Sequence, residues 1–330
     1  MSQLILSSPS RHAVMIEAAA ASASPGQSPV AASWRRSLLH HKLDPRCMTR
    51  PDRLEARAIR QCREASEELL QAAAPMMDRL AGGLLDSGCT LVLADAQGVI
   101  LDTRRRPGDE ADFSMAGLSE GACWSEAAEG TNAIGTCLAD GRATLIWRNQ
   151  HFFARNLPLI CISAPIEGPG GRLAGVLNFS SSAEGLGRVQ SRLMALAVQD
   201  GAVQAGTALF HAAFPGARIL SLGQSPGQSP GLGPSLLALD RDELVIGANR
   251  AARRVLEAPS GATLLGQPLS DLLGETGEAG AEMQRALRAE LTRMLQRNGG
   301  NVTRTAKALG ISRATLYRKM KAVGLERPDA

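Results

Sequence analysis

The segment NVTRTAKALGISRATLYRKMK, residues 301–321, predicts two short helices joined by a tight turn. Gly310 can take the left-handed conformation that such a turn requires, and Ser312 can cap the helix that follows it. A further helix is predicted just before this segment, ending near residues 298–300. Each helix repeats apolar residues at intervals of three or four, the spacing that buries one face. These residues are Met283, Leu287, Leu291, Met294, Val302, Ala306, Leu309, Leu316, Met320 and Val323.

The opposite face of the last helix is small, basic and hydroxyl-bearing. At 100° per residue, Ala314, Arg318 and Lys321 lie opposite the apolar stripe, with Thr315 and Tyr317 beside them. Two short helices with a Gly-containing turn, the second with a small residue and an Arg near its start, are typical of a helix-turn-helix that enters a DNA groove. The alternative is a three-helix bundle that binds only protein.

Residues 300–302 and 306–321 closely resemble the DNA-binding domain of the Fis family. The resemblance implies that Arg313, Thr315 and Arg318 approach bases or their flanking phosphates. It also implies that Lys319 and Lys321 favour phosphates, and that the domain works as a dimer on a two-fold site. The residues expected at the DNA interface are Ser312, Arg313, Ala314, Thr315, Tyr317, Arg318, Lys319 and Lys321.

The basic charge of the chain is concentrated in this tail. Residues 281–327 hold 11 Lys or Arg against 3 Glu, which leaves 25 basic and 29 acidic side chains elsewhere. A basic segment joined to a mildly acidic body is the pattern of a phosphate-binding domain attached to a domain with another task. With 6 Phe, 3 Trp and 1 Tyr, the chain has few rings for stacking single strands, so duplex DNA is the expected nucleic acid.

Length and composition limit the remaining classes. A chain of 330 residues predicts two or three domains. It has no apolar run of about 18 residues and no secretory pattern at its N-terminus, so we expect no membrane span and a cytoplasmic protein. The 6 cysteines form no C-x-x-C pair, and no histidines lie at metal-ligand spacing. We therefore expect no zinc site, no disulfide framework and no cofactor.

The N-terminal half predicts a helical lead-in followed by a sheet. The helical pattern continues to the glycines at 82–83, and β-rich runs follow it. A helical segment near residues 131–140 interrupts these runs, and Pro169-Gly170-Gly171 joins the last two as a hairpin. The predicted strands are residues 89–94, 99–102, 143–147, 159–166 and 173–179. An antiparallel sheet with flanking helices is an α+β fold.

Distinctive motifs lie in this half: Gly121, Trp124-Ser125-Glu126, Gly130-Thr131-Asn132-Ala133-Ile134-Gly135-Thr136, His151-Phe152, Ala164-Pro165-Ile166 and Gly175-Val176-Leu177. Over roughly residues 33–182 they look like the GAF sensor domain of acetoin catabolism regulator-type activators. The resemblance implies a small-metabolite cavity between sheet and helices, with Trp124, Asn132 and His151 as candidate wall residues. The alternative is that Trp124 is a core residue and that Asn132 caps a helix.

One motif points to an enzyme. Residues 117–121 match the G-x-S-x-G nucleophile elbow around Ser119, and Asp140 and His151 follow in hydrolase order. An elbow needs a buried strand before its serine, whereas residues 108–113 are polar. We therefore expect no catalytic residues and no enzyme activity.

The middle of the chain is short. Residues 221–234 form a Gly/Pro/Ser tract that should behave as a linker, and residues 235–276 resemble the first half of a PAS domain. In activators with this sensor and this tail, a large ATPase domain normally lies between them. The chain has no G-x-x-x-x-G-K-[ST] loop, so we expect no ATP-dependent activation.

The predicted organisation is a poorly ordered N-terminus (1–32), a helical lead-in with the GAF domain (33–210), a linker (211–234), a partial PAS-like segment (235–276) and an all-α helix-turn-helix (281–327). We expect a sequence-specific, dimeric DNA-binding transcriptional regulator with a small-molecule effector. Contact with RNA polymerase or a full-length activator is a further expectation. The alternative is an architectural or antagonist DNA-binding protein whose GAF domain is a ligand-free dimerisation scaffold.

Overall fold

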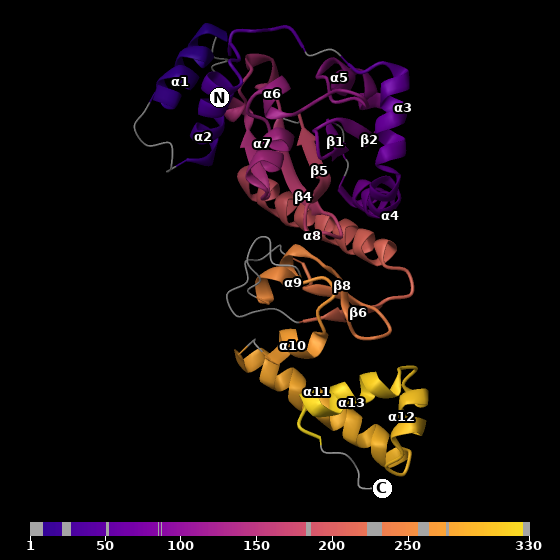
Figure 1. Cartoon of the computed structure of the whole chain (residues 1–330). Coiled ribbons are helices and arrows are strands. Elements are labelled where there is room, and N and C mark those ends of the chain that lie inside the picture. Colours follow the sequence, from indigo (N-terminus) through magenta and orange to yellow (C-terminus); the bar gives the residue numbers. More distant parts are fainter. Residues whose placement is uncertain are drawn as a thin grey trace. The chain divides into compact units, whose positions relative to one another are not determined.

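The structure, a computed structural model, describes residues 9–21, 28–50, 53–84, 86, 88–182, 186–222, 233–256, 264–274 and 277–325 (Figure 1). The chain divides into two compact units. The first comprises Met1–Gly168 and Leu173–Leu209, and the second comprises Pro169–Arg172 and Phe210–Ala330. None of the described helices has the length and apolar character needed to cross a bilayer.

The first unit is built on a five-stranded antiparallel sheet of order β2-β1-β5-β4-β3, which confirms the predicted α+β fold. Successive side chains of a strand point to opposite faces. Leu91 and Leu93 therefore enter one core, while Val92 and Ala94 enter another. The strands are β1 (Cys89–Asp95), β2 (Ile100–Arg105), β3 (Thr144–Trp147), β4 (Ile160–Glu167) and β5 (Leu173–Ser181).

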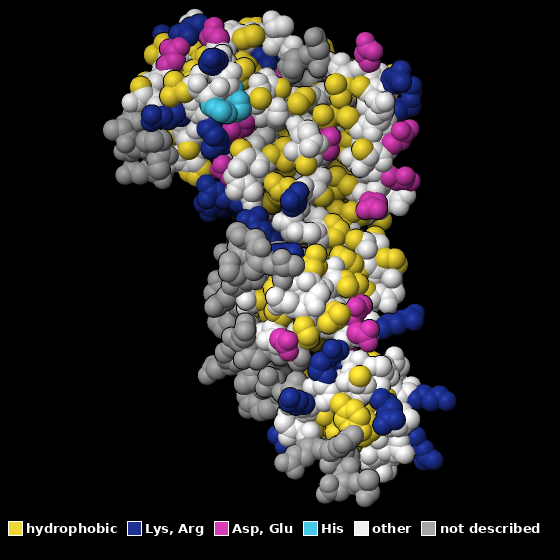
Figure 2. Space-filling view, viewed as in Figure 1, with side chains coloured by type: hydrophobic (Ala, Val, Ile, Leu, Met, Phe, Trp, Pro, Cys, Tyr) yellow, Lys and Arg dark blue, Asp and Glu magenta, His cyan; other side chains and the backbone are white. Residues whose placement is uncertain are grey.

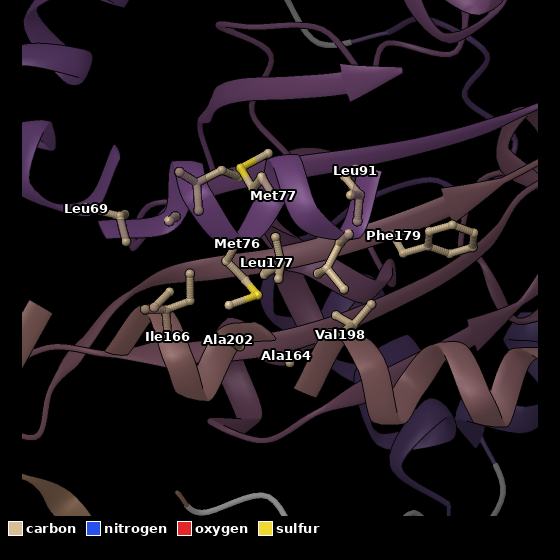
Figure 3. Packing of buried hydrophobic residues seen from close by; sticks show 14 of the residues in the cluster. Leu69, Met76, Met77, Leu91, Ala164, Ile166, Leu177, Phe179, Val198 and Ala202 are labelled. Carbon is tan, nitrogen blue, oxygen red and sulfur yellow. The ribbon is translucent and has the colours of Figure 1, made fainter. Parts of the chain in front are cut away.

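Helices cover both faces of this sheet. On one face, α4 (Glu67–Leu84) and α8 (Arg188–Ala213) enclose a core in which Met76 and Val198 pack near Leu177 (Figure 3). The α-helices between β2 and β3 in the chain are α5 (Glu110–Met115), α6 (Glu126–Glu129) and α7 (Ala133–Asp140). The opposite face is covered by residues of α5 and α7 and by the loop that carries Trp124, and α6 packs against α7.

The N-terminal region is more structured than the sequence predicts. Residues 9–21 form a helix, α1 (Pro9–Ala21), where we expected a poorly ordered terminus. Ile16 is fully buried and packs in one cluster with Trp34 and Phe152. The remaining lead-in helices are α2 (Pro29–Arg35), a π-helical turn (Arg36–His40) and α3 (Ala56–Ala65).

The second unit begins with a three-stranded antiparallel sheet of order β6-β7-β8. Its core includes Leu237, Val245 and Leu269. Strand β6 lies inside the segment that we expected to be a linker, and residues 223–232 of that segment fall outside the described residues. The elements are β6 (Arg218–Ser221), β7 (Leu236–Leu239), β8 (Val245–Ala248), α9 (Arg250–Val255) and α10 (Leu269–Gly274).

Three helices end the described chain, as the apolar spacing predicts. They are α11 (Gly277–Arg297), α12 (Val302–Ala308) and α13 (Arg313–Ala322). The buried residues Leu291, Ala306 and Leu316, one from each helix, share a single core. This core fixes which face of α13 is turned outward.

Candidate nucleic-acid interface and effector site

Local hydrogen bonds define the start of α12 and of α13. Asn301 caps α12, because its side chain accepts a hydrogen bond from the backbone N–H of Arg304 at 2.9 Å. The helix ends at Ala308, and Gly310 in the following turn has a φ of +67°, the left-handed conformation expected there. Ser312 caps α13 by accepting from the backbone N–H of Thr315 at 3.1 Å. The turn that separates the two helices is therefore specified residue by residue.

The outer face of α13 has the predicted composition. Leu316 and Met320 are buried, at 0% and 2% exposure, whereas Arg313, Ala314, Arg318 and Lys321 are exposed. Figure 2 shows Lys and Arg side chains on the visible face of the C-terminal helices. The geometry thus leaves small and cationic groups at the solvent side of the helix, and contact of these groups with DNA remains a prediction.

Not every residue predicted at the DNA interface is free to reach a groove. Thr315 is buried and its hydroxyl lies 2.8 Å from that of Ser312, so it supports the helix cap. Tyr317 is partly buried against the helical core. The side chain of Lys319 is 12% exposed, and its Nζ lies 2.9 Å from Oε1 of Glu243.

The partner of Lys319 belongs to an acidic turn, residues 240–243, between β7 and β8. Asp240 shapes this turn by accepting hydrogen bonds from the backbone N–H groups of Asp242 and Leu244, both at 2.9 Å. Arg318 donates from Nη2 to the carbonyl of Asp242 at 2.7 Å. Desolvation lowers the pKa of Lys319, and the Glu243 carboxylate acts in the opposite direction. The acidic turn therefore binds the charged ends of Lys319 and Arg318, two of the residues predicted to contact DNA.

Substitution Glu243→Gln is expected to increase DNA affinity by about three- to tenfold, because Lys319 loses its internal anion and one negative charge is removed near α13. Gel-shift titration at fixed salt measures the change. Glu290→Gln is the matched control, since Glu290 is an exposed partner of Arg293 on α11 and carries the same charge. Equal affinities of the two variants would contradict a competing role for Glu243.

The three candidate effector residues of the sensor occupy separate bonding environments. Trp124 donates from Nε1 to the Gly117 carbonyl at 2.8 Å and belongs to the core against α7. Asn132 caps α7, accepting from the backbone N–H of Gly135 at 2.9 Å. His151 is fully buried, and its Nδ1 lies 3.0 Å from the Arg148 carbonyl. The structure thus gives each residue an internal role, and their contact with an effector remains a prediction.

The environment of His151 makes stability depend on pH. Burial lowers the pKa of His151 from 6.5 to about 4, and the nearby His12 acts in the same direction. The unfolded chain binds a proton at His151 more readily than the folded chain does. The folded state therefore keeps its full stability above about pH 6.5, and protonation of His151 in the unfolded state lowers the free energy of unfolding as pH falls toward 4. We expect a free energy of unfolding about 2 kcal/mol lower at pH 5 than at pH 7. Denaturant titrations of the native chain and of His151→Gln measure it; an equal pH slope in both would contradict the assignment.

Sequence reasoning missed a buried network that ties the lead-in helices to the sensor. Ser33 donates to Oε1 of Glu126 at 2.5 Å and lies within 2.8 Å of the Thr131 hydroxyl. Arg36 donates to both oxygens of Glu126, each at 2.7 Å. The polar residues Ser33 and Arg36 within the apolar lead-in indicate that hydrogen-bond partners are needed. The sequence does not identify these partners, because they lie about a hundred residues further along the chain.

A second missed feature is a polar row across the sheet. The strand registers place four residues opposite one another on β2, β1, β5 and β4, and directly opposite residues share a sheet face. The row comprises Arg105, Thr90, Ser180 and Cys161. Beside it, the amide of Asn178 accepts from Ser163 at 2.9 Å and donates to Ser180 at 2.8 Å. Polar letters within otherwise apolar strands were the signal for this row.

The elbow-like motif does not assemble a catalytic triad among the described residues. The Ser119 hydroxyl lies 3.1 Å from that of Ser114. Asp140 forms ion pairs with Arg36 and Arg142. The ring of His151 is bonded to backbone as described above, so the three groups have different partners.

Two protein families match separate parts of the chain. The family described as "MimR, N-terminal domain" matches residues 10–219. The chain belongs to this MimR N-terminal domain family. The family described as "Bacterial regulatory protein, Fis family" matches residues 288–322, which include α12 and α13. Both resemblances inferred from the sequence are supported, and residues 220–287 separate the two matches.

Relatives of this MimR-family chain are named as regulators. It is 34% identical over 245 residues to the acetoin catabolism regulatory protein of Cupriavidus necator, covering 73% of this chain and 36% of that protein. It is 32% identical over 156 residues to the propane 2-monooxygenase operon transcriptional activator MimR of Mycolicibacterium smegmatis, covering 46% and 25%. The chain thus spans about a third or less of the length of these curated relatives.

A solved structure supports the fold. The crystal structure of the E. coli DhaR(N)-DhaL complex contains a chain that matches with a TM-score of 0.50 at 17% identity. The match covers 74% of the present chain and 81% of that chain. At this identity the likeness concerns the fold alone.

Proposed function

We propose that this protein is a transcriptional regulator that binds duplex DNA as a homodimer through α13 and senses a small-molecule effector through its N-terminal GAF-like unit. The observation that carries the proposal is the outer face of α13, where Arg313, Ala314 and Arg318 are exposed above a buried apolar stripe. The names of the relatives, which describe transcriptional regulators, agree with it.

In this mechanism the start of α13 enters the major groove and the neighbouring basic residues bind phosphates. Arg318 and Arg313 read base edges or flanking phosphates, and Lys319 and Lys321 add electrostatic affinity. Two copies of α13 in a dimer contact half-sites about 34 Å apart, one helical turn of DNA. An effector that favours one dimer geometry changes that spacing and hence the affinity.

The regulator acts in the cytoplasm without ATP-driven promoter opening. The sequence between the two family matches, residues 220–287, is too short for a domain-sized nucleotide-driven motor, and the chain carries no G-x-x-x-x-G-K-[ST] loop. Its effect on transcription then comes from occupying an operator or from contacting RNA polymerase or a full-length activator.

Selection of bound fragments from the source genome, followed by footprinting, tests the proposal. We expect a recurrent two-fold site protected over two half-sites one helical turn apart. Binding of unrelated fragments with equal affinity at physiological salt would overturn sequence-specific regulation and favour an architectural DNA-binding protein.

A second candidate function is that of an architectural or antagonist protein whose GAF-like unit only dimerises. The internal bonding of Trp124 and Asn132 favours it, because the indole N–H and both ends of the amide are already hydrogen-bonded within the sensor. A thermal-shift screen with small metabolites separates the two functions. A ligand at 100 times its Kd adds about 2.7 kcal/mol to stability, whereas a scaffold gives no shift.

A further inference from the structure

The polar row of the sensor ends in a buried cation. The side chain of Arg105 is 4% exposed, and its Nη2 donates to the Leu118 carbonyl at 2.7 Å. Its guanidinium carbon lies 5.7 Å from the centre of the Phe113 ring. Phe113 and Leu118 both belong to the core between the sheet and α7. The guanidinium therefore sits among apolar groups on the helix-covered face of the sheet.

This cation has unused hydrogen-bonding capacity. Nε and Nη1 of Arg105 are buried, and neither has a hydrogen-bond partner among the described residues. Nε lies 3.5 Å from Oε2 of Glu110, but the Glu110 side chain is 65% exposed, so this ion pair is largely solvated and weak. Desolvation lowers the pKa of Arg105, which reflects the cost of holding its charge here. An anion at Nη1 would remove that cost.

Next to the cation lies a set of neutral polar groups. Thr90 and Ser180 follow Arg105 along the polar row, one strand apart at about 4.8 Å each. The Asn178 amide uses one hydrogen bond at each end, so it retains a further N–H and a further acceptor position. All three neutral side chains are buried. A hydroxyl or carbonyl oxygen could be recognised here, two strand spacings from the backbone of Arg105.

We propose that the polar row is the effector site of the sensor and that it binds a short carboxylic acid bearing a hydroxyl or carbonyl group. Arg105 holds the carboxylate, and Ser180 and Asn178 hold the second oxygen. This inference rests on the proposed sensory function. It places the effector at strands β2, β1 and β5, and not at the earlier candidates Trp124, Asn132 and His151.

The chemistry explains why arginine is placed in this core. A guanidinium forms charge-assisted hydrogen bonds with carboxylates and is less strongly hydrated than an ammonium group, so it enters an apolar site at lower cost. A neutral ligand of the same shape would leave the charge of Arg105 uncompensated. The site should therefore distinguish an acid from its amide.

Isothermal titration calorimetry of the full chain at pH 7 tests the proposal, with acetate, lactate and pyruvate as acids and lactamide as the neutral match for lactate. We expect lactate or pyruvate to bind, with acetate and lactamide each at least about tenfold weaker. In Arg105→Met the affinity for the acid should fall about 10- to 100-fold. In Arg105→Lys, which keeps the charge without the planar fork, the loss should be smaller.

Arg104→Gln is the matched control. Arg104 precedes Arg105 on β2, points to the other face of the sheet, and pairs with Asp78 and Asp102 at 2.7 Å. This variant should bind the acid with unchanged affinity. Circular dichroism establishes that each variant is folded, and the comparison of lactate with lactamide on the native chain needs no variant at all.

Binding of none of the acids, equal binding of lactate and lactamide, or an unchanged affinity in a folded Arg105→Met would each overturn the proposal. Gel shifts on a selected operator fragment separate this failure from failure of the proposed function. Specific DNA binding without acid binding would refute only the effector site. Acid binding to a chain that recognises no operator would refute the regulator and leave the site in place.

Discussion

Substitution of Arg318 by alanine is expected to weaken binding to a selected operator fragment by about 10- to 100-fold. Arg318 is exposed on the outer face of α13, in the middle of the helix that enters the groove in a helix-turn-helix. A well-placed arginine contact with a base contributes about 1–3 kcal/mol of discrimination. Gel-shift titration at one stated salt concentration measures the loss, because phosphate contacts make affinity depend strongly on salt.

Arg293→Ala provides the comparison, since Arg293 lies on α11 of the same helical domain and pairs with the exposed Glu290. It removes one positive charge without altering α13, so only a small, sequence-independent change is expected. Equal operator affinity in Arg318→Ala and the native chain would show that α13 does not read the groove. An equal loss on operator and random DNA would assign Arg318 to a phosphate.

Substitution Gly135→Ala is expected to lower the free energy of unfolding of the sensor unit by about 3 kcal/mol. A Cβ at Gly135 would lie 2.5 Å from the backbone nitrogen of Glu126 and 2.8 Å from the carbonyl oxygen of Trp124. Both atoms belong to backbone and cannot turn aside as a flexible side chain would, so α7 must shift from the loop that it packs against. Denaturant unfolding followed by circular dichroism measures the loss.

The same chemical change at Gly82 should have the opposite sign. Gly82 lies in α4, and a Cβ there would meet nothing within 4 Å. Alanine is favoured over glycine in a helix by up to about 1 kcal/mol, so Gly82→Ala should leave stability unchanged or raise it. Destabilisation of similar size in both variants would refute the close approach at Gly135 as the cause.

Local patterns were sufficient for much of this fold. The strand of residues 89–94 follows from a short β-rich run, and the helix cap at Ser312 follows from the chemistry of one residue; both are found. Helix α1 was missed because its burial depends on Trp34 and Phe152, which come from other segments. Strand β6 was missed because its pairing partner, β7, lies beyond a Gly/Pro/Ser tract.

The candidate sites divide in the same way. The outer face of α13 could be predicted because it depends only on helical periodicity within ten residues. The pairing of Lys319 with Glu243, and the alignment of Arg105 with Ser180, depend on contacts between distant segments. Register is set by the whole sheet, and one residue of slip would move every side chain to the other face, so no single strand reveals the row.

The buried thiol at the end of the polar row gives the sensor a built-in chemical reporter. Burial raises the pKa of Cys161 to about 12, against a smaller opposing effect of the Ser180 hydroxyl. Alkylating reagents attack the thiolate and need access to it, so in the closed core this sulfur is inert. The rate at which Cys161 is alkylated therefore measures how often strands β4 and β5 separate from the helices that cover them. An effector bound in this core would slow the alkylation of Cys161.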